Sequence, residues 1–437
     1  MNIKKNHLII LFLSFLALDP LASISDSIIW TEQSKGGGTL WGVHFIDSLQ
    51  GFAFGDGGTM YKTVNGGMNW INNRLSSSDT IYGMHFVNCS TGFLCTGSGR
   101  IYKTTDTART WTQNYFRTGW LSGISFWNKD TGWAVGSSKR IPYSIYNAVV
   151  YSTKNGGVSW DSSAISGPYS LKSVQSLNGK AVYVCGFNYL AISQNSGASW
   201  NTATSYTGIS DPQFQNSNGY INIAAFVSPT NGLAVGRYGH IMRTQNGGAS
   251  WSSARINDFT WLQDVKYIDS LRAVVVGERG VVFSSTDGGT TWSKRYPRHT
   301  SSTNAPWFRA LYTINSANMW MVGDSGIIMK GRFFSHTTAA ELNTKKNNTD
   351  ALNILSAYSV SQNDVCVKYH TNASSKLILV IYDVSGRTVF NKSINTQTAG
   401  SGYIGLKPKK KLSTGTYYLR MISEKKIIAT KRFIVIK

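Results

Sequence analysis

Carboxylates are scarce in this 437-residue chain. It carries 21 Asp and Glu against 43 Lys and Arg, so its formal net charge is +22. Between residues 26 and 344 the glutamates are Glu32, Glu278 and Glu341. This thin supply disfavours hydrolysis by a pair of carboxylates. The positive charge is concentrated near the end, because residues 345–437 hold 16 Lys and Arg against four acidic residues, a net +12.

Cysteines are also few, at positions 89, 95, 185 and 366. Cys89 and Cys95 flank one predicted hairpin turn, and a disulfide is permitted in an exported protein. However, Cys95 and Cys185 occupy a repeat position that other units fill with Phe or Val. We therefore expect buried thiols that act as small hydrophobic residues.

Long apolar runs are absent after the first 25 residues, so nothing beyond them is expected to span a membrane. The N-terminal stretch itself combines Lys4 and Lys5 with a short apolar segment at 8–18. That pattern predicts a secretory signal peptide over residues 1–25. The sequence also has no GxSxG, no Cys/His pair, no phosphate loop and no zinc-ligand spacing, so no cofactor and no metal are predicted.

What the chain does have is a repeat that ends in tryptophan, such as TDGGTTW at 286–292. The six terminal tryptophans are 41, 49, 40, 51 and 41 residues apart. This Trp-ended string is called the box below. Each repeat consists of three expected strands, the box and a fourth strand, which predicts an all-β propeller over 26–332. A seventh unit at 307–331 lacks its fourth strand, and SIIWTEQ (27–33) is a strand without a unit. We expect this N-terminal strand to complete the seventh blade and close the ring.

The repeated box has a structural explanation. The Ser/Thr at its first position and the Asp/Asn at its third can accept hydrogen bonds from backbone N–H groups. Its Gly permits a positive φ, and its Trp covers apolar surface. Four of the six boxes carry Asn, which also disfavours a catalytic role. The structural pairs are Asn65 and Trp70, Asp106 and Trp111, Asn155 and Trp160, Asn195 and Trp200, Asn246 and Trp251, and Asp287 and Trp292.

The pattern S/T-x-D/N-x-G-x-S/T-W resembles the Asp-box, or BNR repeat. The longer string AVGRYGHIMRTQNGGASW (234–251) is similar to the propellers of photosystem II stability/assembly factors. The resemblance covers about 28–331 and implies the fold. It implies little about function, because unrelated enzymes and receptors share the box.

A polar linker is predicted at 333–350, followed by a small Ig-like β-sandwich at 351–437. The strings IYDVSGRTVF (381–390), STGTYYLRM (413–421) and KRFIVIK (431–437) resemble the C-terminal type A sorting domain of type IX secretion. This resemblance implies that the type IX machinery is a partner and that the protein is secreted or held at the outer-membrane surface. A carbohydrate- or protein-binding module is the alternative. No organised aromatic platform accompanies the basic residues, so nucleic acid is not expected as a partner.

Loops that join the second and third strands of each blade should converge on one face of the propeller. They carry arginines and tyrosines, which recognition surfaces favour. We therefore predict a non-catalytic scaffold that binds an unknown extracellular protein or polysaccharide. The candidate binding residues are Arg100, Arg140, Tyr143, Tyr189, Arg237, Tyr238 and Arg279.

A glycoside hydrolase that acts on an extracellular polysaccharide is the alternative function. Glu278, Asp324 and Asp56 occupy one equivalent turn position on blades six, seven and one, and two such carboxylates could serve an inverting hydrolase. Acidic residues are common in such turns in any case. His44 and His85 hold matching positions in neighbouring blades, where packing between blades is favoured over a metal pair.

Overall fold

The computed structural model describes residues 27–33, 36–115, 119–139, 146–165, 170–186, 189–202, 221–253, 256, 260–297, 305–334, 353–361, 364–371, 375–396, 400–406, 408, 410–423 and 426–435. The predicted signal peptide and nearly all of the predicted linker lie outside these ranges. Within them the chain forms seven four-stranded antiparallel sheets and, near the C-terminus, one sheet of three strands and one of four. The all-β, propeller-type fold class is therefore confirmed.

Each of the first three blades is a meander of four consecutive strands that runs from the innermost strand outwards. Blade one is β2 (Leu40–Phe45), β3 (Gly51–Gly55), β4 (Met60–Thr63) and β5 (Ile71–Asn72). Blade two is β6 (Ile81–Phe86), β7 (Gly92–Thr96), β8 (Arg100–Thr104) and β9 (Thr112–Tyr115); blade three is β10 (Trp120–Phe126), β11 (Gly132–Lys139), β12 (Tyr146–Thr153) and β13 (Asp161–Ala164).

Blades four to six repeat the same order. Blade four is β14 (Ser173–Ser176), β15 (Val182–Gly186), β16 (Tyr189–Ser193) and β17 (Asn201–Thr202); blade five is β18 (Ile221–Phe226), β19 (Gly232–Gly236), β20 (Ile241–Thr244) and β21 (Ser252–Ser253). Blade six is β22 (Leu262–Tyr267), β23 (Ala273–Gly277), β24 (Val282–Ser285) and β25 (Ser293–Arg295). Short 3₁₀ turns join the second and third strands at η1 (Asp56–Gly58), η3 (Arg237–Gly239) and η4 (Glu278–Gly280).

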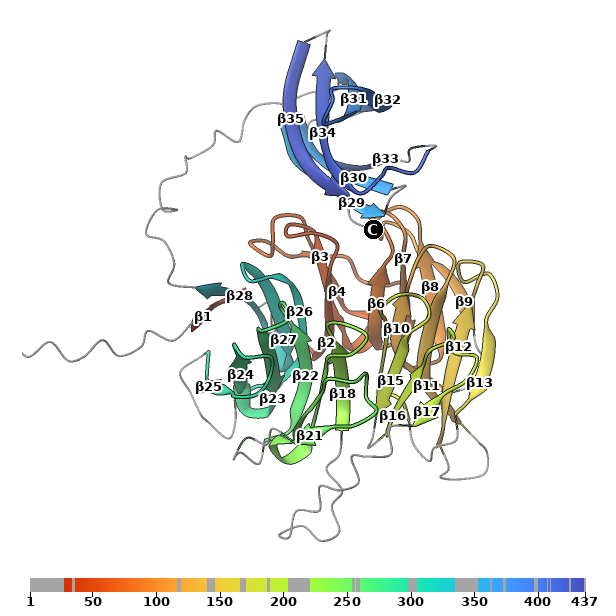
Figure 1. Cartoon of the computed structure of the whole chain (residues 1–437), viewed down its shortest axis with the longest axis vertical. Helices are drawn as coiled ribbons and strands as arrows, with labels where there is room; N and C mark the ends of the chain where they lie inside the picture. Colours follow the sequence, from red (N-terminus) through yellow and green to blue (C-terminus); the bar gives the residue numbers. More distant parts are fainter. Residues whose placement is uncertain are drawn as a thin grey trace, which may run out of the picture.

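The seventh blade is built from both ends of the propeller. It contains β26 (Phe308–Asn315), β27 (Asn318–Gly323), the turn η5 (Asp324–Gly326) and β28 (Ile328–Phe334). Its fourth strand is β1 (Ser27–Glu32), which pairs antiparallel with β28 from Ser27–Phe334 to Glu32–Met329. The innermost strands contact one another in blade order, and β2 contacts β26, so the ring is closed (Figure 1).

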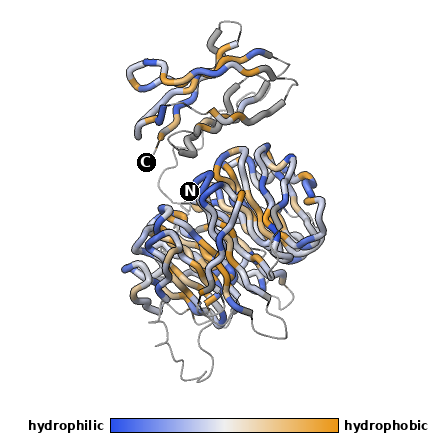
Figure 2. The backbone as a smooth tube through the Cα atoms, turned by 90° about the vertical axis from the view of Figure 1, so that its right-hand side faces the viewer, coloured by the Kyte–Doolittle hydropathy of each residue, from blue (hydrophilic) through white to orange (hydrophobic). Residues whose placement is uncertain are grey.

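An aromatic stack recurs between blades. Phe45, the last residue of β2, lies flat on Trp320 of blade seven with ring centroids 3.5 Å apart. Equivalent stacks join Phe93 to Phe126 at 3.8 Å and Tyr183 to Phe226 at 3.6 Å. Hydrophobic residues are accordingly concentrated along the strands (Figure 2). The stack also explains a sequence rule, Phe followed six residues later by Gly, because a Cβ on Gly51, Gly92, Gly132 or Gly232 would overlap the Phe ring.

The C-terminal unit is a β-sandwich. Its strands are β29 (Asn353–Ser361), β30 (Asp364–Thr371), β31 (Ser375–Asp383), β32 (Thr388–Thr396), β33 (Gly400–Leu406), β34 (Gly415–Ser423) and β35 (Lys426–Val435). The two sheets have the orders β29-β30-β33 and β32-β31-β34-β35. Val365 and Leu406 of the first sheet and Leu379 and Leu419 of the second are fully buried in one cluster. This shared core holds the sheets face to face.

Candidate functional site

The six boxes are hydrogen-bonded turns between the third and fourth strands. In the first box, Thr63 Oγ1 donates to Asn65 Oδ1 at 3.0 Å and accepts from the Gly67 N–H at 2.8 Å. In the last box, Asp287 accepts from Ser285 Oγ and from the N–H of Thr291. Burial alone would raise the pKa of Asp287, but hydrogen bonds from Thr291 outweigh it and lower that pKa to about 2.

The boxes also connect neighbouring blades. In four boxes the Trp meets the inner-strand Phe of its own blade edge to face, as Trp70 does with Phe45 at 5.9 Å. A cation from the preceding blade reaches the box backbone: Lys62 Nζ donates to the Thr107 carbonyl at 2.9 Å, and Lys103 Nζ to the Gly156 carbonyl at 2.7 Å. The box side chains are thus committed to the fold.

The predicted binding residues are not gathered in one place. Arg100 forms an ion pair with Asp79 at 2.7 Å, and Tyr189 is buried. Tyr238 and Arg279 hold equivalent turn positions with φ of 57° and 55°, and Arg279 is exposed. Arg140 and Tyr143 lie outside the described residues. Arg237 is the one described member of the predicted set that lines the central cavity.

The three candidate acids are engaged as follows. Asp56 accepts a hydrogen bond from Trp41 Nε1 at 2.7 Å, and Asp324 forms an ion pair with Arg309 at 2.8 Å. Glu278 begins η4 and is 8% exposed. Two of these carboxylates therefore position a tryptophan and an arginine at the cavity.

A cavity of about 850 Å³ lies at the centre of the ring, bordered by all seven innermost strands or the segments next to them. Six of these strands (β2, β6, β10, β18, β22 and β26) carry a β-bulge at the same point near their beginning. A bulge interrupts the regular alternation of side chains between the two faces of a strand and so changes the direction in which one side chain points. The bulged residues that line the cavity are Trp41, Tyr82, Ser122, Asn222, Gln263 and Arg309.

Arginines and aromatic residues form a continuous arc around the cavity mouth. The Arg237 guanidinium lies 3.8 Å from the centroid of Trp261, whose ring is 5.7 Å from that of Trp307. Arg309 lies between Trp307 and Trp41, at 4.5 and 4.9 Å from their centroids.

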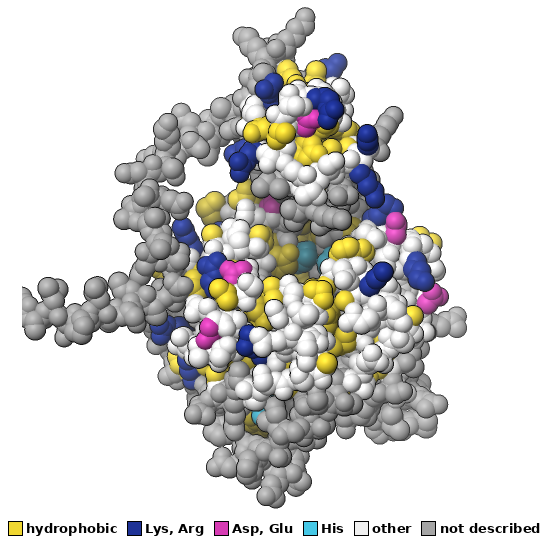
Figure 3. All heavy atoms as spheres, viewed as in Figure 1, with side chains coloured by type: hydrophobic (Ala, Val, Ile, Leu, Met, Phe, Trp, Pro, Cys, Tyr) yellow, Lys and Arg dark blue, Asp and Glu magenta, His cyan; other side chains and the backbone are white. Residues whose placement is uncertain are grey.

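The arc continues into blades two and three. Tyr82 is 5.5 Å from Trp41 and 5.0 Å from Trp120, measured between ring centroids. Trp120 ends the arc and is 45% exposed. In the space-filling view, basic and hydrophobic side chains lie side by side on the face of the propeller that it shows (Figure 3).

The cavity is positively charged. Its charged lining residues are Lys172, Arg237, Lys266, Arg309 and Asp264. Burial and repulsion from Arg237 and Arg309 lower the pKa of Lys172 to about 8. Lys266 is neutralised by Asp264 at 2.7 Å. Arg309 is likewise paired, with Asp324, so Lys172 and Arg237 supply the net positive charge of the cavity, which favours an anionic ligand.

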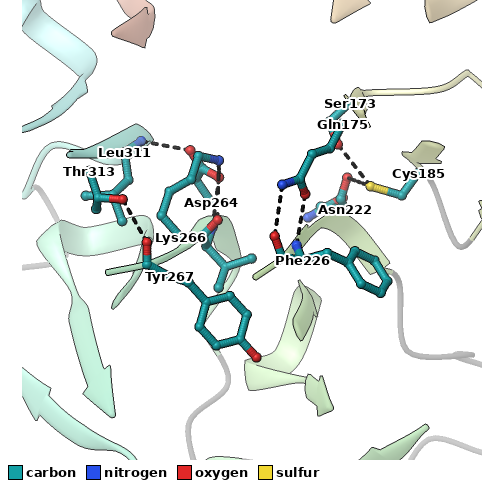
Figure 4. A network of polar contacts seen from close by, with 11 residues as sticks. Ser173, Gln175, Cys185, Asn222, Phe226, Asp264, Lys266, Tyr267, Leu311 and Thr313 are labelled. Atoms are coloured by element: carbon teal, nitrogen blue, oxygen red, sulfur yellow. Dashed lines mark hydrogen bonds and ion pairs between the residues drawn. The ribbon is translucent and has the colours of Figure 1, made fainter. Parts of the chain in front are cut away.

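Deeper in the ring, polar side chains hold the edges of the inner strands (Figure 4). Gln175 both donates to the Phe226 carbonyl at 3.0 Å and accepts from its N–H at 2.9 Å. Asp264 Oδ2 accepts from the Leu311 N–H at 2.8 Å, and Thr313 donates to the Tyr267 carbonyl at 2.8 Å. The innermost strand of each blade has a neighbouring strand on one side only. These side chains satisfy backbone groups on its other side.

His44 and His85 pack between blades one and two. His44 Nε2 accepts from the Phe86 N–H at 3.2 Å, and its ring is 5.7 Å from that of His85. Burial, with a smaller contribution from His85, lowers the pKa of His44, and burial lowers the pKa of His85 to about 4. Among the described residues, no group of three or more His, Cys, Asp or Glu is placed to hold a metal ion.

Three of the cysteines, Cys89, Cys95 and Cys185, are buried and free. Their burial matches the expectation of packed thiols. Within the described ranges, no helix is long and apolar enough to cross a membrane.

Of the central arc, the predicted set of binding residues contained Arg237 alone. The available signal was the triplet of apolar residue, variable residue and glycine that begins several inner strands, as in LWG (40–42), IYG (81–83) and LSG (121–123). In these triplets the bulge turns the middle residue into the cavity.

The tail is the part that sequence comparison places in a family. Residues 361–437 match the family described as "Secretion system C-terminal sorting domain". This match confirms the predicted resemblance of the tail to a type IX sorting domain. It implies recognition by the type IX machinery, export, and a secreted or cell-surface location. No curated protein matches the chain.

The propeller is similar to solved structures at low sequence identity. YCF48 bound to a D1 peptide is 17% identical with a TM-score of 0.55, covering 69% of this chain and 96% of that one. YCF48 from Cyanidioschyzon merolae is 15% identical with a TM-score of 0.55, covering 70% and 98%. The WD40 repeats of RRP9 are 9% identical with a TM-score of 0.54, covering 70% and 98%. These likenesses bear on the fold alone.

Proposed function

We propose that this exported propeller is a non-catalytic binding scaffold whose ligand occupies the mouth of the central cavity. The observation that carries the proposal is the continuous arc from Arg237 to Trp120. Arginine and tryptophan are the residue types that dominate binding energy at recognition sites. A concave, mostly apolar site with a few charged groups is also the usual form of a ligand pocket.

Two further observations support binding over hydrolysis. Asp56 and Asp324 are engaged with Trp41 and Arg309, so they serve to position the arc. The YCF48 propeller, of the same fold, is bound to a D1 peptide in one solved structure. The ligand class that we propose is an anionic or polar extracellular polymer or protein.

The test uses two matched tryptophans on β10. Trp120 begins this strand at the cavity mouth and is 45% exposed, whereas Trp127 follows its other end and is 49% exposed. The full chain, its Trp120→Ala variant and its Trp127→Ala variant would each be immobilised and exposed to envelope extract of the source organism. Retained proteins and glycans would then be quantified.

We expect a component that the wild type and Trp127→Ala retain and Trp120→Ala loses. Equal retention by all three would place binding elsewhere and overturn the proposal. Cleavage of the retained polymer during incubation would instead favour the glycoside hydrolase.

A further inference from the structure

We propose that the cavity mouth binds an acidic saccharide, a chain of sugar rings that carries carboxylate or sulfate groups. This inference rests on the proposed function and assigns its ligand class. It follows from the way in which charge and aromatic surface are divided between the two halves of the mouth.

One half of the mouth is cationic. Lys172, Arg237 and Arg309 line it from blades four, five and seven, and burial together with repulsion from the two arginines lowers the pKa of Lys172 to about 8. Asp324 takes hydrogen bonds from Nε and Nη2 of Arg309, which leaves donors on Nη1 for a ligand. Asp56 and Asp324 lie outside the cavity lining. An anionic group is the natural occupant of this half.

The other half is aromatic. Trp41, Tyr82 and Trp120 form an unbroken row across blades one to three, with neighbouring rings inclined by 46° and 34°. The rings thus make a curved wall whose outer member, Trp120, presents nearly half of its surface to solvent. The C–H faces of sugar rings can stack on such a wall while their hydroxyl edges stay hydrated.

A peptide added as a strand fits this site less well. Peptide recognition of that kind needs free backbone groups at a sheet edge. Here the N–H groups of Phe86, Phe226 and Leu311 on the inner strands are already bonded to His44, Gln175 and Asp264. The remaining attractive features are ring faces and cations, and a charged saccharide matches both.

Isothermal titration calorimetry on the purified full chain tests the inference with four probes. These are tetragalacturonate, its fully methyl-esterified counterpart, a sulfated galactan tetrasaccharide and tetraglutamate. The first pair shares its sugar rings and differs in whether the carboxyl groups are charged or capped as methyl esters. The third separates sulfate from carboxylate, and the last supplies the same charge without sugar rings. Trp120→Ala and Lys172→Met would be compared with Trp127→Ala and Lys129→Met.

We expect at least one acidic saccharide to bind. For the saccharide that binds, removing its charge, or introducing Trp120→Ala or Lys172→Met, should weaken affinity at least tenfold. Trp127→Ala and Lys129→Met should leave affinity unchanged, because Trp127 and Lys129 lie beyond the opposite end of β10 and Lys129 is 71% exposed. Unfolding curves confirm that each variant is folded.

Equal or tighter binding of tetraglutamate would overturn the inference and leave a protein ligand for the proposed scaffold. If no saccharide binds while the capture experiment still shows a component lost in Trp120→Ala, the ligand class is wrong and the proposed function stands. If the capture experiment also fails, both are wrong.

Discussion

Arg309 and Asp324 form a two-pronged ion pair in blade seven. Arg309 Nε donates to Asp324 Oδ1 at 2.8 Å, and Nη2 donates to Oδ2 at 3.1 Å. The pair fixes the guanidinium between Trp307 and Trp41, at the junction of the last and first blades. A carboxylate that the sequence marked as a possible acid is thus bonded to a member of the arc at the cavity mouth.

Asp324→Asn tests that assignment. The amide keeps an acceptor for Arg309 but loses the charge, so we expect a loss of about 1 kcal/mol in the free energy of unfolding, as for a partly exposed ion pair. Ligand retention by the arc should fall as well. Urea denaturation measures the first effect, with the exposed Asp161→Asn as the control.

The same variant addresses the hydrolase alternative. A wild-type protein that hydrolyses an extracellular polysaccharide, and loses this activity in Asp324→Asn or Glu278→Gln, would show that the carboxylates are catalytic. We expect no hydrolysis by the wild type.

The blades were predictable from the sequence because local features recur among them. The box Trp recurs in six blades, the Phe at the end of the inner strand with a Gly six residues later recurs in four, and each has a local steric reason. Even the shared seventh blade could be predicted, because the unit at 307–331 lacked a fourth strand and SIIWTEQ (27–33) was a strand without a unit.

The cavity arc could not be predicted in the same way. Its members come from six blades and differ in type, so the triplet of apolar residue, variable residue and glycine marks Trp41 and Tyr82 but not the others. The bulges that expose Trp41, Tyr82 and Arg309 also interrupt the usual alternation of a strand. Loop residues such as Arg100 looked equally suitable in the sequence. Its ion pair with Asp79 depends on tertiary packing.

Ring closure by β1 predicts a large effect of one N-terminal residue. Trp30 lies over Gly331 of β28, so closely that a Cβ on that glycine would meet the indole ring. Trp30→Ala removes this partly buried contact and should lower the free energy of unfolding by about 2–3 kcal/mol. Ile29 in the same strand is 55% exposed, so Ile29→Ala should cost about 0.5 kcal/mol or less. Equal melting temperatures for the two variants would show that β1 does not stabilise the ring.

The two boxes with aspartate predict a specific acid sensitivity. In Asp106, as in Asp287, hydrogen bonds outweigh burial and lower the pKa to about 2. A depressed carboxyl pKa in the folded state contributes stability that is complete above the unfolded value near 4 and is lost as pH falls through 2. Because both side chains are only partly buried, the contribution after solvent screening is about 0.5–1 kcal/mol each.

Asn already occupies the same position in four boxes, so Asp106→Asn with Asp287→Asn should fold normally. Its free energy of unfolding should change less between pH 4 and pH 2 than that of the wild type. If the free energy of unfolding changed equally with pH in the variant and the wild type, the two aspartates would not be the source of the acid sensitivity. The mild change Asp161→Asn controls for net charge.

Arg279 predicts a stabilising substitution. It is exposed and holds a left-handed φ of 55°, at the position where blade one has Gly57 with φ 60°. A non-glycine residue in this conformation destabilises the folded state by about 1–2 kcal/mol. Arg279→Gly removes this strain, but glycine also raises the entropy of the unfolded chain, which offsets part of the gain. We therefore expect a net gain of about 0.5–1 kcal/mol, measured by thermal unfolding, with ligand binding unchanged. A clear loss of binding would restore Arg279 to the site.

The pKa of Lys172 predicts how binding of an acidic saccharide responds to pH. Burial and the charges of Arg237 and Arg309 lower this pKa to about 8. An anion beside the ammonium group raises it, so the protonated lysine is the form that binds, and affinity should fall as pH rises from 7 to 9. A shift of one pKa unit corresponds to a tenfold change in affinity.

The other charged groups around Lys172 do not mimic this response. Arginine side chains in general stay protonated in proteins, Asp264 is paired with Lys266, and burial raises the pKa of the Cys185 thiol on β15 to about 11. Uronate carboxylates stay ionised throughout the range. Titration calorimetry with tetragalacturonate at pH 7, 8 and 9 should therefore show weakening in the wild type and in Lys129→Met, and a flat profile in Lys172→Met. A wild-type affinity that does not change with pH would place the bound anion away from Lys172 and assign its recognition to the arginines alone.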